Sequence, residues 1–488
     1  MCGVFGIRSA ERDVARVTYF GLFALQHRGQ ESAGIAVSDE GRVTALRDMG
    51  LVTQVFSEQK LRGLTGQVAV GHARYSTTGS THWANAQPII QQGLARTVAL
   101  GHNGNLTNTS ELRAGLLAEG ARLRSTSDTE VIAALIARDE RPLQEAVAGA
   151  MGRIEGAFSA VLLADGKLVG FRDPHGIRPL ALGRLEDDWL LASETCAFDL
   201  LGAELECELA AGEMVIVDDD GYEIVQAVEQ DGEGALCIFE FIYFARPDSK
   251  LRGVELHGAR VRMGEQLAAE APVEADLVMA VPDSGTPAAI GFARASGIPF
   301  AEGLIKNRYV GRTFIQPDQA LREHGIKTKF NPLGEVSGKR VVVVDDSIVR
   351  GSTTRQIVAM LFDARAAEVH VRISSPPVVS PCFYGIDMAD EDELIAGRHS
   401  VDEVREMLGA TSLAHLSVEG LQDSTRRPEG TFCRACLTKS YPTRIPEDLK
   451  LAKLRFEGQT EAAGSERSRA NPTNTNELAT SGTSPKAP

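Results

Sequence analysis

A cysteine directly follows the initiator methionine in the opening string MCGVFGI. Removal of Met1 would leave Cys2 with a thiol and a free α-amine, which are a nucleophile and a candidate base on one residue. The residues after it are apolar, which predicts a buried strand rather than a fraying chain end. We therefore expect Cys2 to be a catalytic nucleophile, although a lone cysteine at this place also fits an accident of sequence.

Two acidic residues end an apolar run in the string VVVVDDSIVRGSTT at 341–354. A short loop follows Asp345 and Asp346, and then a predicted helix whose first turn carries hydroxyl side chains, those of Ser352, Thr353 and Thr354. Unpaired backbone N–H groups and the positive end of a helix suit a phosphate group, to which Arg350 adds charge. Neighbouring strand residues point to opposite faces, which favours binding of hydroxyls or a cation over acid–base chemistry. An acidic N-cap is the structural alternative.

The string VMAVPDSGTP at 278–287 repeats this strand-to-helix design. Its loop, formed by Asp283, Ser284 and Gly285, could hold a second phosphate group. Pro287 suits a first helical turn, where its missing N–H costs nothing. Two such loops in one domain indicate a phosphate-rich ligand.

Four cysteines form a separate pattern, a close C-x-x-C pair with two distant partners: Cys237, Cys382, Cys433 and Cys436. Such a set can bind zinc or an iron–sulfur cluster, and the spacing alone does not choose between them. Buried, inert cysteines are the structural alternative. Cys196 and Cys207 lie outside the pattern.

Two kinds of element must position these residues. From Cys2 to about residue 225, short alternating runs separated by Gly and Asp turns predict antiparallel sheets, with helices between some of them. After about residue 230, continuous apolar runs followed directly by helices predict parallel strands covered on both faces. We therefore expect an α+β domain over 2–230, an α/β domain over 231–456, and a disordered polar tail over 457–488.

Length and charge limit the possible classes of protein. A chain of 488 residues exceeds what one core usually supports, which favours two large domains. The formal net charge of −15 argues against a general nucleic-acid or anionic-membrane surface. No run approaches the roughly 20 apolar residues that cross a bilayer, and no signal peptide is recognisable. We expect a cytoplasmic protein.

The string at 341–354 resembles the phosphoribosyl pyrophosphate (PRPP) signature of type I phosphoribosyltransferases. The resemblance implies that the paired acids meet the ribose hydroxyls, that the following loop holds the 5-phosphate, and that 283–285 is the pyrophosphate loop. Ser284, Asp345 and Asp346 would then surround one magnesium ion per subunit. The implied PRPP-binding residues are Asp283, Ser284, Gly285, Lys306, Lys329, Asp345, Asp346, Ser347, Arg350, Gly351, Ser352 and Thr353.

In the first half, HRGQESAG (27–34), GHARYSTTG (71–79), GHNGNLTN (101–108) and STSDTE (125–130) accompany Cys2. Together they resemble the class II, N-terminal-nucleophile glutamine amidotransferases, which implies an αββα sandwich. The resemblance assigns the oxyanion donors to the Asn103 side chain and the Gly104 backbone N–H, the clamp on the glutamine carboxylate to Arg74, and the partner of its ammonium group to Asp128. It gives no metal role to three nearby histidines, which we interpret as structural: His27, His72 and His102.

The two halves together resemble the amidophosphoribosyltransferase family over residues 2 to about 450. This implies that ammonia from glutamine attacks C1 of PRPP to give 5-phosphoribosylamine, pyrophosphate and glutamate, the first committed step of purine biosynthesis. Tyr243 would line an internal ammonia channel. The long polar string at 306–336 would be a mobile flap whose basic residues approach the pyrophosphate: Lys306, Arg308, Lys327 and Lys329.

The string contexts of the four cysteines resemble a subgroup of this family that carries one [4Fe–4S] cluster per subunit, of structural or oxygen-sensing role. The family also suggests homotetramers and feedback inhibition by purine nucleotides. Two alternatives share one half each. A glucosamine-phosphate or asparagine-forming synthase would lack the PRPP string, and a PRPP-sensing DNA-binding regulator would lack the N-terminal nucleophile and normally carry a basic recognition module.

Overall fold

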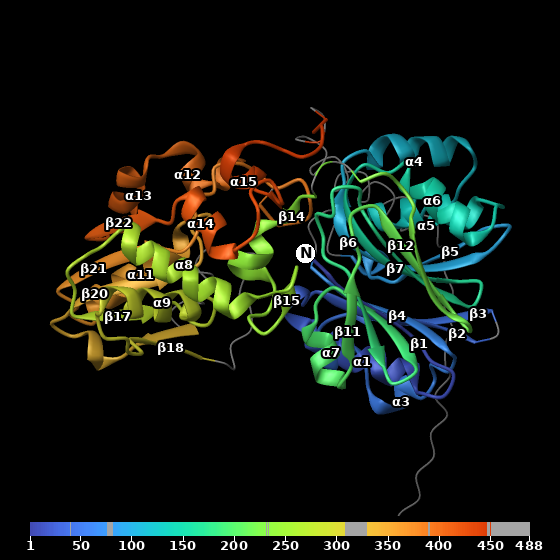
Figure 1. Ribbon diagram of the computed structural model, residues 1–488, viewed down its shortest axis with the longest axis horizontal. Helices are drawn as coiled ribbons and strands as arrows, with labels where there is room; N and C mark the ends of the chain where they lie inside the picture. Colours follow the sequence, from blue (N-terminus) through green and yellow to red (C-terminus); the bar gives the residue numbers. More distant parts are fainter. Residues whose placement is uncertain are drawn as a thin grey trace, which may run out of the picture.

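The computed structural model describes residues 1–39, 41–75, 82–230, 232, 234–307, 329–388, 391–446 and 449. Two halves lie side by side, and the N-terminus is between them (Figure 1). The two flap residues Arg308 and Lys327 and the predicted polar tail over 457–488 lie outside the described residues.

The first half is built on two antiparallel sheets. The seven-stranded sheet has the order β11-β9-β10-β1-β4-β2-β3, and the six-stranded sheet has the order β13-β12-β8-β7-β6-β5. The strands of the first sheet are β1 (Gly3–Arg8), β2 (Ser32–Asp39), β3 (Arg42–Met49), β4 (Val68–Arg74), β9 (Ala181–Leu185), β10 (Asp188–Ala192) and β11 (Glu204–Glu208). Those of the second are β5 (Ile89–Gln92), β6 (Thr97–Leu106), β7 (Gly156–Ala164), β8 (Lys167–Arg172), β12 (Glu213–Asp218) and β13 (Gly221–Gln226).

Helices cover the outer face of each sheet. Beside the first sheet lie α1 (Val14–Ala24), the 3-10 helix η1 (Gln26–Arg28), α2 (Val52–Val55), α3 (Glu58–Leu61) and α7 (Cys196–Leu201). Beside the second lie α4 (Thr109–Ala118), α5 (Asp128–Arg138) and α6 (Leu143–Met151), with the 3-10 helix η2 (Trp83–Asn85) in the connection before β5. A third apolar cluster fills the space between the sheets, so the half is an αββα sandwich, as predicted.

The sequence explains where the first strand and the helix of Asp128 form. β1 is central, between β10 and β4, and its side chains alternate: Phe5 and Ile7 pack under the helices, whereas Val4 packs between the sheets. α5 begins after Ser127, whose side chain accepts a hydrogen bond from the Thr129 N–H at 3.3 Å.

The second half contains a parallel sheet with the order β17-β20-β21-β22, as the apolar runs predicted. Its strands are β17 (Leu277–Ala280), β20 (Arg340–Asp345), β21 (Glu368–Ile373) and β22 (Ser412–His415). One face packs on α8 (Leu256–Glu270), α9 (Thr286–Ser296) and α14 (Val418–Thr425), and the other on α11 (Ser352–Asp363) and α13 (Val401–Leu408). Both faces are therefore covered.

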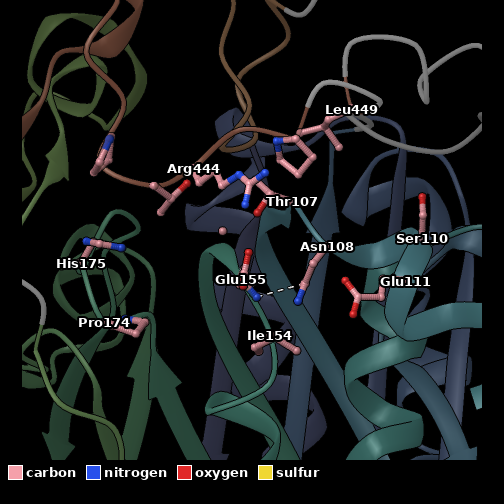
Figure 2. Close-up of a pocket in the computed structure, with 14 residues that line it drawn as sticks. Thr107, Asn108, Ser110, Glu111, Ile154, Glu155, Pro174, His175, Arg444 and Leu449 are labelled. Atoms are coloured by element: carbon pink, nitrogen blue, oxygen red, sulfur yellow. Dashed lines mark hydrogen bonds between the residues drawn. The ribbon is translucent and has the colours of Figure 1, made fainter. Parts of the chain in front are cut away.

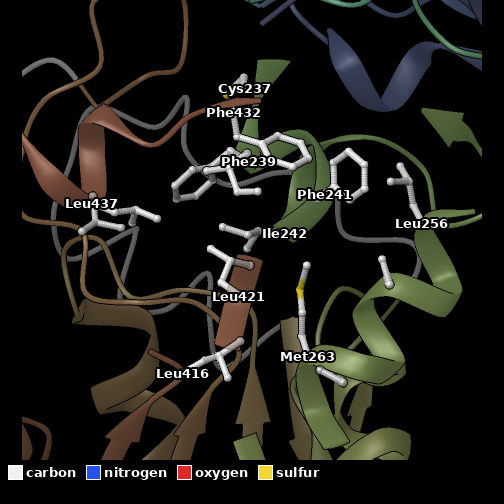
Figure 3. Packing of buried hydrophobic residues seen from close by; sticks show 14 of the residues in the cluster. Cys237, Phe239, Phe241, Ile242, Leu256, Met263, Leu416, Leu421, Phe432 and Leu437 are labelled. Carbon is white, nitrogen blue, oxygen red and sulfur yellow. The ribbon is translucent and has the colours of Figure 1, made fainter. Parts of the chain in front are cut away.

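Short elements complete the second half and join it to the first. The pairs are β14 (Leu236–Cys237) with β23 (Phe432–Cys433), β15 (Lys250–Leu251) with β16 (Val254–Glu255), and β18 (Leu304–Lys306) with β19 (Phe330–Pro332). The short helices are the π-helix η3 (Glu240–Phe244), η5 (Gly334–Val336), η6 (Glu391–Glu393), α12 (Ile395–Arg398) and α15 (Ala435–Thr438). Figure 3 shows Phe241 and Ile242 of η3 packed into the core of the second half.

Candidate functional site

Cys2 lies at the start of the central strand β1 and is 8% exposed. Its backbone N–H donates to Asn103 Oδ1 at 3.0 Å, and its Sγ lies 3.6 Å from the carbonyl oxygen of Tyr75. Its own carbonyl accepts a hydrogen bond from Arg28 Nε at 2.9 Å. The residue is therefore held from several sides although it is next to the chain end.

Asn103 and Gly104 lie on β6, opposite Cys2. Asn103 is fully buried, and its Nδ2 has no hydrogen-bond partner among the described residues. Gly104 has φ +148°, and a Cβ built there would lie 2.0 Å from the carbonyl oxygen of Ala157, so only glycine fits. A buried donor without a partner is costly, and here it faces the same strand ends as the thiol. An oxyanion would satisfy it.

Asp128 and Arg74 supply opposite charges near these residues. Asp128 accepts backbone N–H groups from Leu106 at 3.1 Å and from Thr129 at 2.9 Å. Burial alone would raise the pKa of Asp128, but nearby His102 and these N–H groups outweigh it and hold the pKa below its usual value. Arg74 ends β4, is 3% exposed, and its Nη1 lies 2.7 Å from Glu31 Oε1. An ionised carboxylate and a guanidinium suit an amino acid's ammonium and carboxylate.

Burial changes the acidity of an amine at this chain end. It lowers the pKa of the Met1 α-amine to about 5, and the charges of Arg178 and Arg28 push in the same direction, whereas Cys2 raises it. Burial of the Met1 α-amine, one residue before Cys2, therefore favours its unprotonated form. A free amine is what a base needs.

Four charged residues around the chain end were not predicted as functional from the sequence. The side chains of Arg28, Arg178, Glu194 and Glu240 are all fully buried and form one ion-pair network. Glu240 is a charged residue inside the apolar string FEFIYF. Charged residues are rarely buried without a partner, so its position was the signal in the sequence for a buried ion pair. The three histidines that we interpreted from the sequence as structural each bond protein groups: His27 to Glu194 at 2.7 Å, His72 to the His102 carbonyl at 3.0 Å, and His102 to Thr129 at 3.3 Å.

The predicted PRPP residues gather at the carboxyl ends of β17 and β20. Asp345 ends β20, and Asp346 follows it; Ser347 Oγ donates to Asp346 Oδ2 at 2.7 Å. Burial and the charge of Asp346 raise the pKa of Asp345 well above its usual value. Lys329 acts on Asp345 in the opposite direction but does not offset this repulsion, which a divalent cation would reduce further.

Two loops flank this acidic pair. Gly285 starts α9, and a Cβ built on it would lie 2.5 Å from the carbonyl oxygen of Val344, so the loop packs directly on the end of β20. Gly351 starts α11, with φ +74° and no side chain capping the helix. The hydroxyl residues predicted to hold a phosphate, Ser352, Thr353 and Thr354, occupy the first turn of α11.

The basic residues at this site lie at its edge. Lys306 Nζ is 2.5 Å from Asp283 Oδ2, and Lys329 acts electrostatically on Asp345. Lys306 ends β18 and Lys329 directly precedes β19, on either side of the segment 308–328, which is outside the described residues. Arg350 pairs with Glu393. Tyr243 lies on η3 between the two sites and is 36% exposed.

The four predicted cluster cysteines also come together. Cys237 and Cys433 are register partners in the β14–β23 pair, and Cys436 lies on α15. The thiol groups of Cys433 and Cys436 interact electrostatically with each other and with those of Cys237 and Cys382. Burial raises the pKa of Cys237 to about 11. Over the described ranges, three or more His, Cys, Asp or Glu side chains nowhere lie close enough to share one metal ion.

A cavity of about 600 Å³ lies elsewhere, between the first half and the C-terminal segment (Figure 2). Its walls include Thr107, Glu111, Glu155, His175 and Arg444. No residue predicted to bind glutamine or PRPP lines it. In the described part of the chain, no helix is long and apolar enough to cross a membrane.

Known proteins resemble both this arrangement and this sequence. A family model described as a glutamine amidotransferase domain matches residues 72–199. The amidophosphoribosyltransferase of Synechococcus elongatus is 53% identical over 467 residues, which cover 94% of each chain. That of Bacillus subtilis is 46% identical over 461 residues, which cover 93% of this chain and 96% of that one.

Two solved structures match over nearly their whole length. The B. subtilis glutamine PRPP amidotransferase complexed with ADP and GMP superposes with a TM-score of 0.86 at 46% identity, covering 92% of this chain and 98% of that one. A structure described as the allosteric regulatory enzyme of purine biosynthesis gives 0.87 at 47% identity, covering 93% and 99%. The predicted two-part fold is thereby confirmed, and the chain belongs to the amidophosphoribosyltransferase family.

Proposed function

We propose that this protein converts glutamine and PRPP into 5-phosphoribosylamine, pyrophosphate and glutamate, as the first committed step of purine biosynthesis. The observation that carries the glutaminase assignment is the pairing of Cys2 with Asn103. Asn103 Oδ1 accepts a hydrogen bond from the Cys2 N–H, and Asn103 Nδ2 is buried without a partner among the described residues. Membership of the amidophosphoribosyltransferase family supports the overall reaction.

The first half would release ammonia by way of a thioester. The Cys2 thiol gives its proton to the α-amine of the same residue, and the sulfur attacks the carboxamide carbon of glutamine. Asn103 Nδ2 and the Gly104 N–H donate to the oxygen as it becomes negative. The protonated amine then gives its proton to the leaving nitrogen, ammonia departs, and water releases glutamate from the thioester. Arg74 and Asp128 hold the two charged ends of the substrate.

The second half would bind PRPP across its two loops. The first turn of α11 holds the 5-phosphate, and the loop at Asp283–Gly285 holds the pyrophosphate. Ser284, Asp345 and Asp346 would hold magnesium, which when bound neutralises charge on the pyrophosphate leaving group. Lys306 and Lys329 would add positive charge at the edge of this site. Ammonia then forms the bond to C1 while the bond from C1 to pyrophosphate breaks.

Tyr243 would line the path of ammonia between the sites. It lies on η3, the π-helix that follows β14; Arg28 links η3 to the Cys2 carbonyl, and the N-terminus lies between the two halves (Figure 1). Ammonia released into water would be protonated or lost, so a sheltered path favours transfer.

The four cysteines would hold one [4Fe–4S] cluster per subunit. Three of these cysteines are buried and Cys382 is partly buried, and their mutual electrostatic interaction also supports this proposal. Anaerobic purification followed by iron, sulfide and zinc analysis tests it, with about four irons and four sulfides expected per subunit. Zinc without sulfide would contradict it.

We also propose that the protein acts in the cytoplasm. None of the seven cysteines, all of which lie within the described residues, forms a disulfide, which suits a reducing compartment.

Purine nucleotides would act as feedback inhibitors, and the subunits would form a homotetramer. The solved structure of the B. subtilis relative contains ADP and GMP, which supports the first part. Equilibrium sedimentation and nucleotide titration of the activity test the two parts separately.

The decisive experiment compares the wild type with Cys2→Ala, using PRPP and either glutamine or ammonia. The variant should lose glutamine-dependent synthesis by at least about 10³-fold because the covalent route is gone. Its ammonia-dependent synthesis should remain, since the second half is untouched. Retained use of glutamine would contradict the assignment of the nucleophile.

A further inference from the structure

The carbonyl group of Cys2 is held by one arginine that is itself fully enclosed. Arg28 Nε donates to that carbonyl at 2.9 Å. The two remaining nitrogens of its guanidinium reach Glu240, Nη2 to Oε1 at 2.8 Å and Nη1 to Oε2 at 3.0 Å. Phe244 stacks on the same guanidinium, with its ring centre 4.6 Å from Cζ. The position of Arg28 therefore depends on η3.

Glu240 belongs to the second half, and its backbone is fixed there. Arg260 Nη2 donates to the Glu240 carbonyl at 3.2 Å, and its Nε donates to the Phe241 carbonyl at 2.8 Å. The next two side chains, Phe241 and Ile242, are buried in the core of the second half (Figure 3). The Glu240 carboxylate therefore reaches into the glutaminase half from a rigid support.

A second glutamate contacts Arg28, but its role differs. Glu194 is part of the first half and pairs with Nη1 of Arg28 only. Its oxygens are shared with His27 at 2.7 Å and with Ser249 Oγ at 2.7 Å. Glu240 alone of the two forms the two-point fork that sets the plane of the guanidinium, and hence the direction of Nε.

We propose that Glu240 is a positioning residue for the glutaminase reaction: by fixing Arg28, it holds the Cys2 carbonyl so that the thiol and amine face Asn103. This inference rests on the proposed role of Cys2 as the nucleophile. It means that the first half acquires its full activity only with the second half in place. The support lies three residues before Tyr243 on the same π-helix, so movement of η3 reaches the nucleophile directly.

Charge supports the same conclusion. Burial alone would lower the pKa of Arg28, but Glu240 and Glu194 outweigh burial and raise it, so the guanidinium remains charged inside the protein. Removal of one partner from a buried ion pair leaves an uncompensated charge that must move or recruit water. Arg28 would then turn toward Glu194, and its bond to the Cys2 carbonyl would weaken.

The test uses full-length Glu240→Gln, which keeps the shape of the side chain and removes its charge. The kcat for glutamine hydrolysis should fall about 10- to 100-fold, because small errors in nucleophile position have effects of this size. The KM for glutamine should change less than about threefold, since Arg74 and Asp128 do not contact Glu240. Ammonia-dependent synthesis should stay within about twofold of the wild type, because the PRPP loops are not altered.

Further variants separate positioning from folding. Glu240→Asp should recover part of the lost kcat, since it restores the charge. Arg28→Lys should resemble Glu240→Gln, and the double variant should be no worse than either single one, because both act through the same contact. Glu58→Gln is the matched control: it removes an exposed partner of Arg16 and should leave both activities unchanged.

The outcomes distinguish this inference from the proposed function. If Glu240→Gln keeps the wild-type kcat while Cys2→Ala loses the use of glutamine, the positioning role is overturned. The assignment of Cys2 as the nucleophile then remains intact. Glutamine use retained in Cys2→Ala overturns both. Equal loss of glutamine- and ammonia-dependent synthesis in Glu240→Gln and Glu240→Asp indicates general damage to the fold and overturns the positioning role. A fall in glutamine kcat alone supports it.

Discussion

The two sites of this protein are built in opposite ways. In the first half, Cys2 precedes the central strand β1, Arg74 ends the neighbouring strand β4, and Asn103 lies on β6 of the second sheet, so regular strands hold all three. In the second half, the PRPP residues lie in loops at the ends of parallel strands, with two carboxylates close together and a segment of 21 residues, 308–328, beside them outside the described chain. The first site is held by regular strands, whereas the second gathers negative charge that bound ligands would balance.

This difference predicts how each site fails. A substitution in the first site should disturb both geometry and folding, because the same residues form the sheets. A substitution in the second should remove function with little cost to the fold, because the repulsion among its charges is relieved when one is removed. Two substitutions and one pH titration test this difference between the sites.

The largest effect is expected for Gly104→Ala. The new Cβ would lie 2.0 Å from the Ala157 carbonyl oxygen at a φ of +148°, so β6 and β7 must separate locally. Glutamine-dependent kcat should fall about 10²- to 10³-fold, and the free energy of unfolding should fall by roughly 2–4 kcal/mol. Steady-state kinetics and denaturant unfolding measure the two quantities. Gly115→Ala is the control, because nothing lies within 4 Å of its Cβ on α4, and it should be neutral or slightly stabilising.

A smaller overall effect, and the opposite sign for stability, is expected for Asp345→Asn. PRPP-dependent synthesis should fall about 10²-fold with either nitrogen source, because the cation and ribose site loses a carboxylate. Without magnesium, the free energy of unfolding should rise by about 1 kcal/mol, because repulsion from Asp346 is removed. Asp363→Asn, at the exposed end of α11, should change neither quantity. A marked loss of stability in Asp345→Asn would contradict the contrast between the sites.

The smallest effect at neutral pH concerns two neighbouring histidines in the first half. Burial would lower the pKa of His102, but Asp128 holds it above 6.5; burial lowers the pKa of His72 to about 3, and the charge of Arg74 adds to this. The contribution of His102 to stability should be present below pH 6.5 and lost as pH rises through its raised pKa. The His72 site should lose stability as pH falls from 6.5 toward 3, because only the unfolded chain takes up the proton.

Histidine NMR resolves these two titrations, with His72→Gln and His102→Gln to assign the signals. Equal titration of both rings near pH 6.5 would contradict a preorganised, dry first site. A raised pKa for His102 and a lowered pKa for His72 would support a preorganised, dry first site, in contrast to the second site.

The sequence predicted the parts of this protein that local patterns determine. Alternation predicted the sheets, Pro287 lies in the first turn of α9 where it was expected, and both acidic loops lie at strand ends. The network around Arg28 could not be predicted in the same way. Arg28 and Glu240 are 212 residues apart in the chain, charged residues are usually exposed, and one sequence contains no signal that pairs them.

Met1 adds a constraint on when the protein becomes active. It is 2% exposed, its sulfur contacts Arg178, and Arg178 Nε in turn donates to the Tyr384 carbonyl at 2.9 Å. An aminopeptidase has no access to a methionine packed this way. The proposed role of the Cys2 amine therefore requires removal of Met1 before the segment around Tyr384 docks. A chain that folds before this removal would keep Met1, and the Cys2 nitrogen would remain in a peptide bond. The amount of active protein would then depend on the rate of Met1 removal relative to the rate of folding.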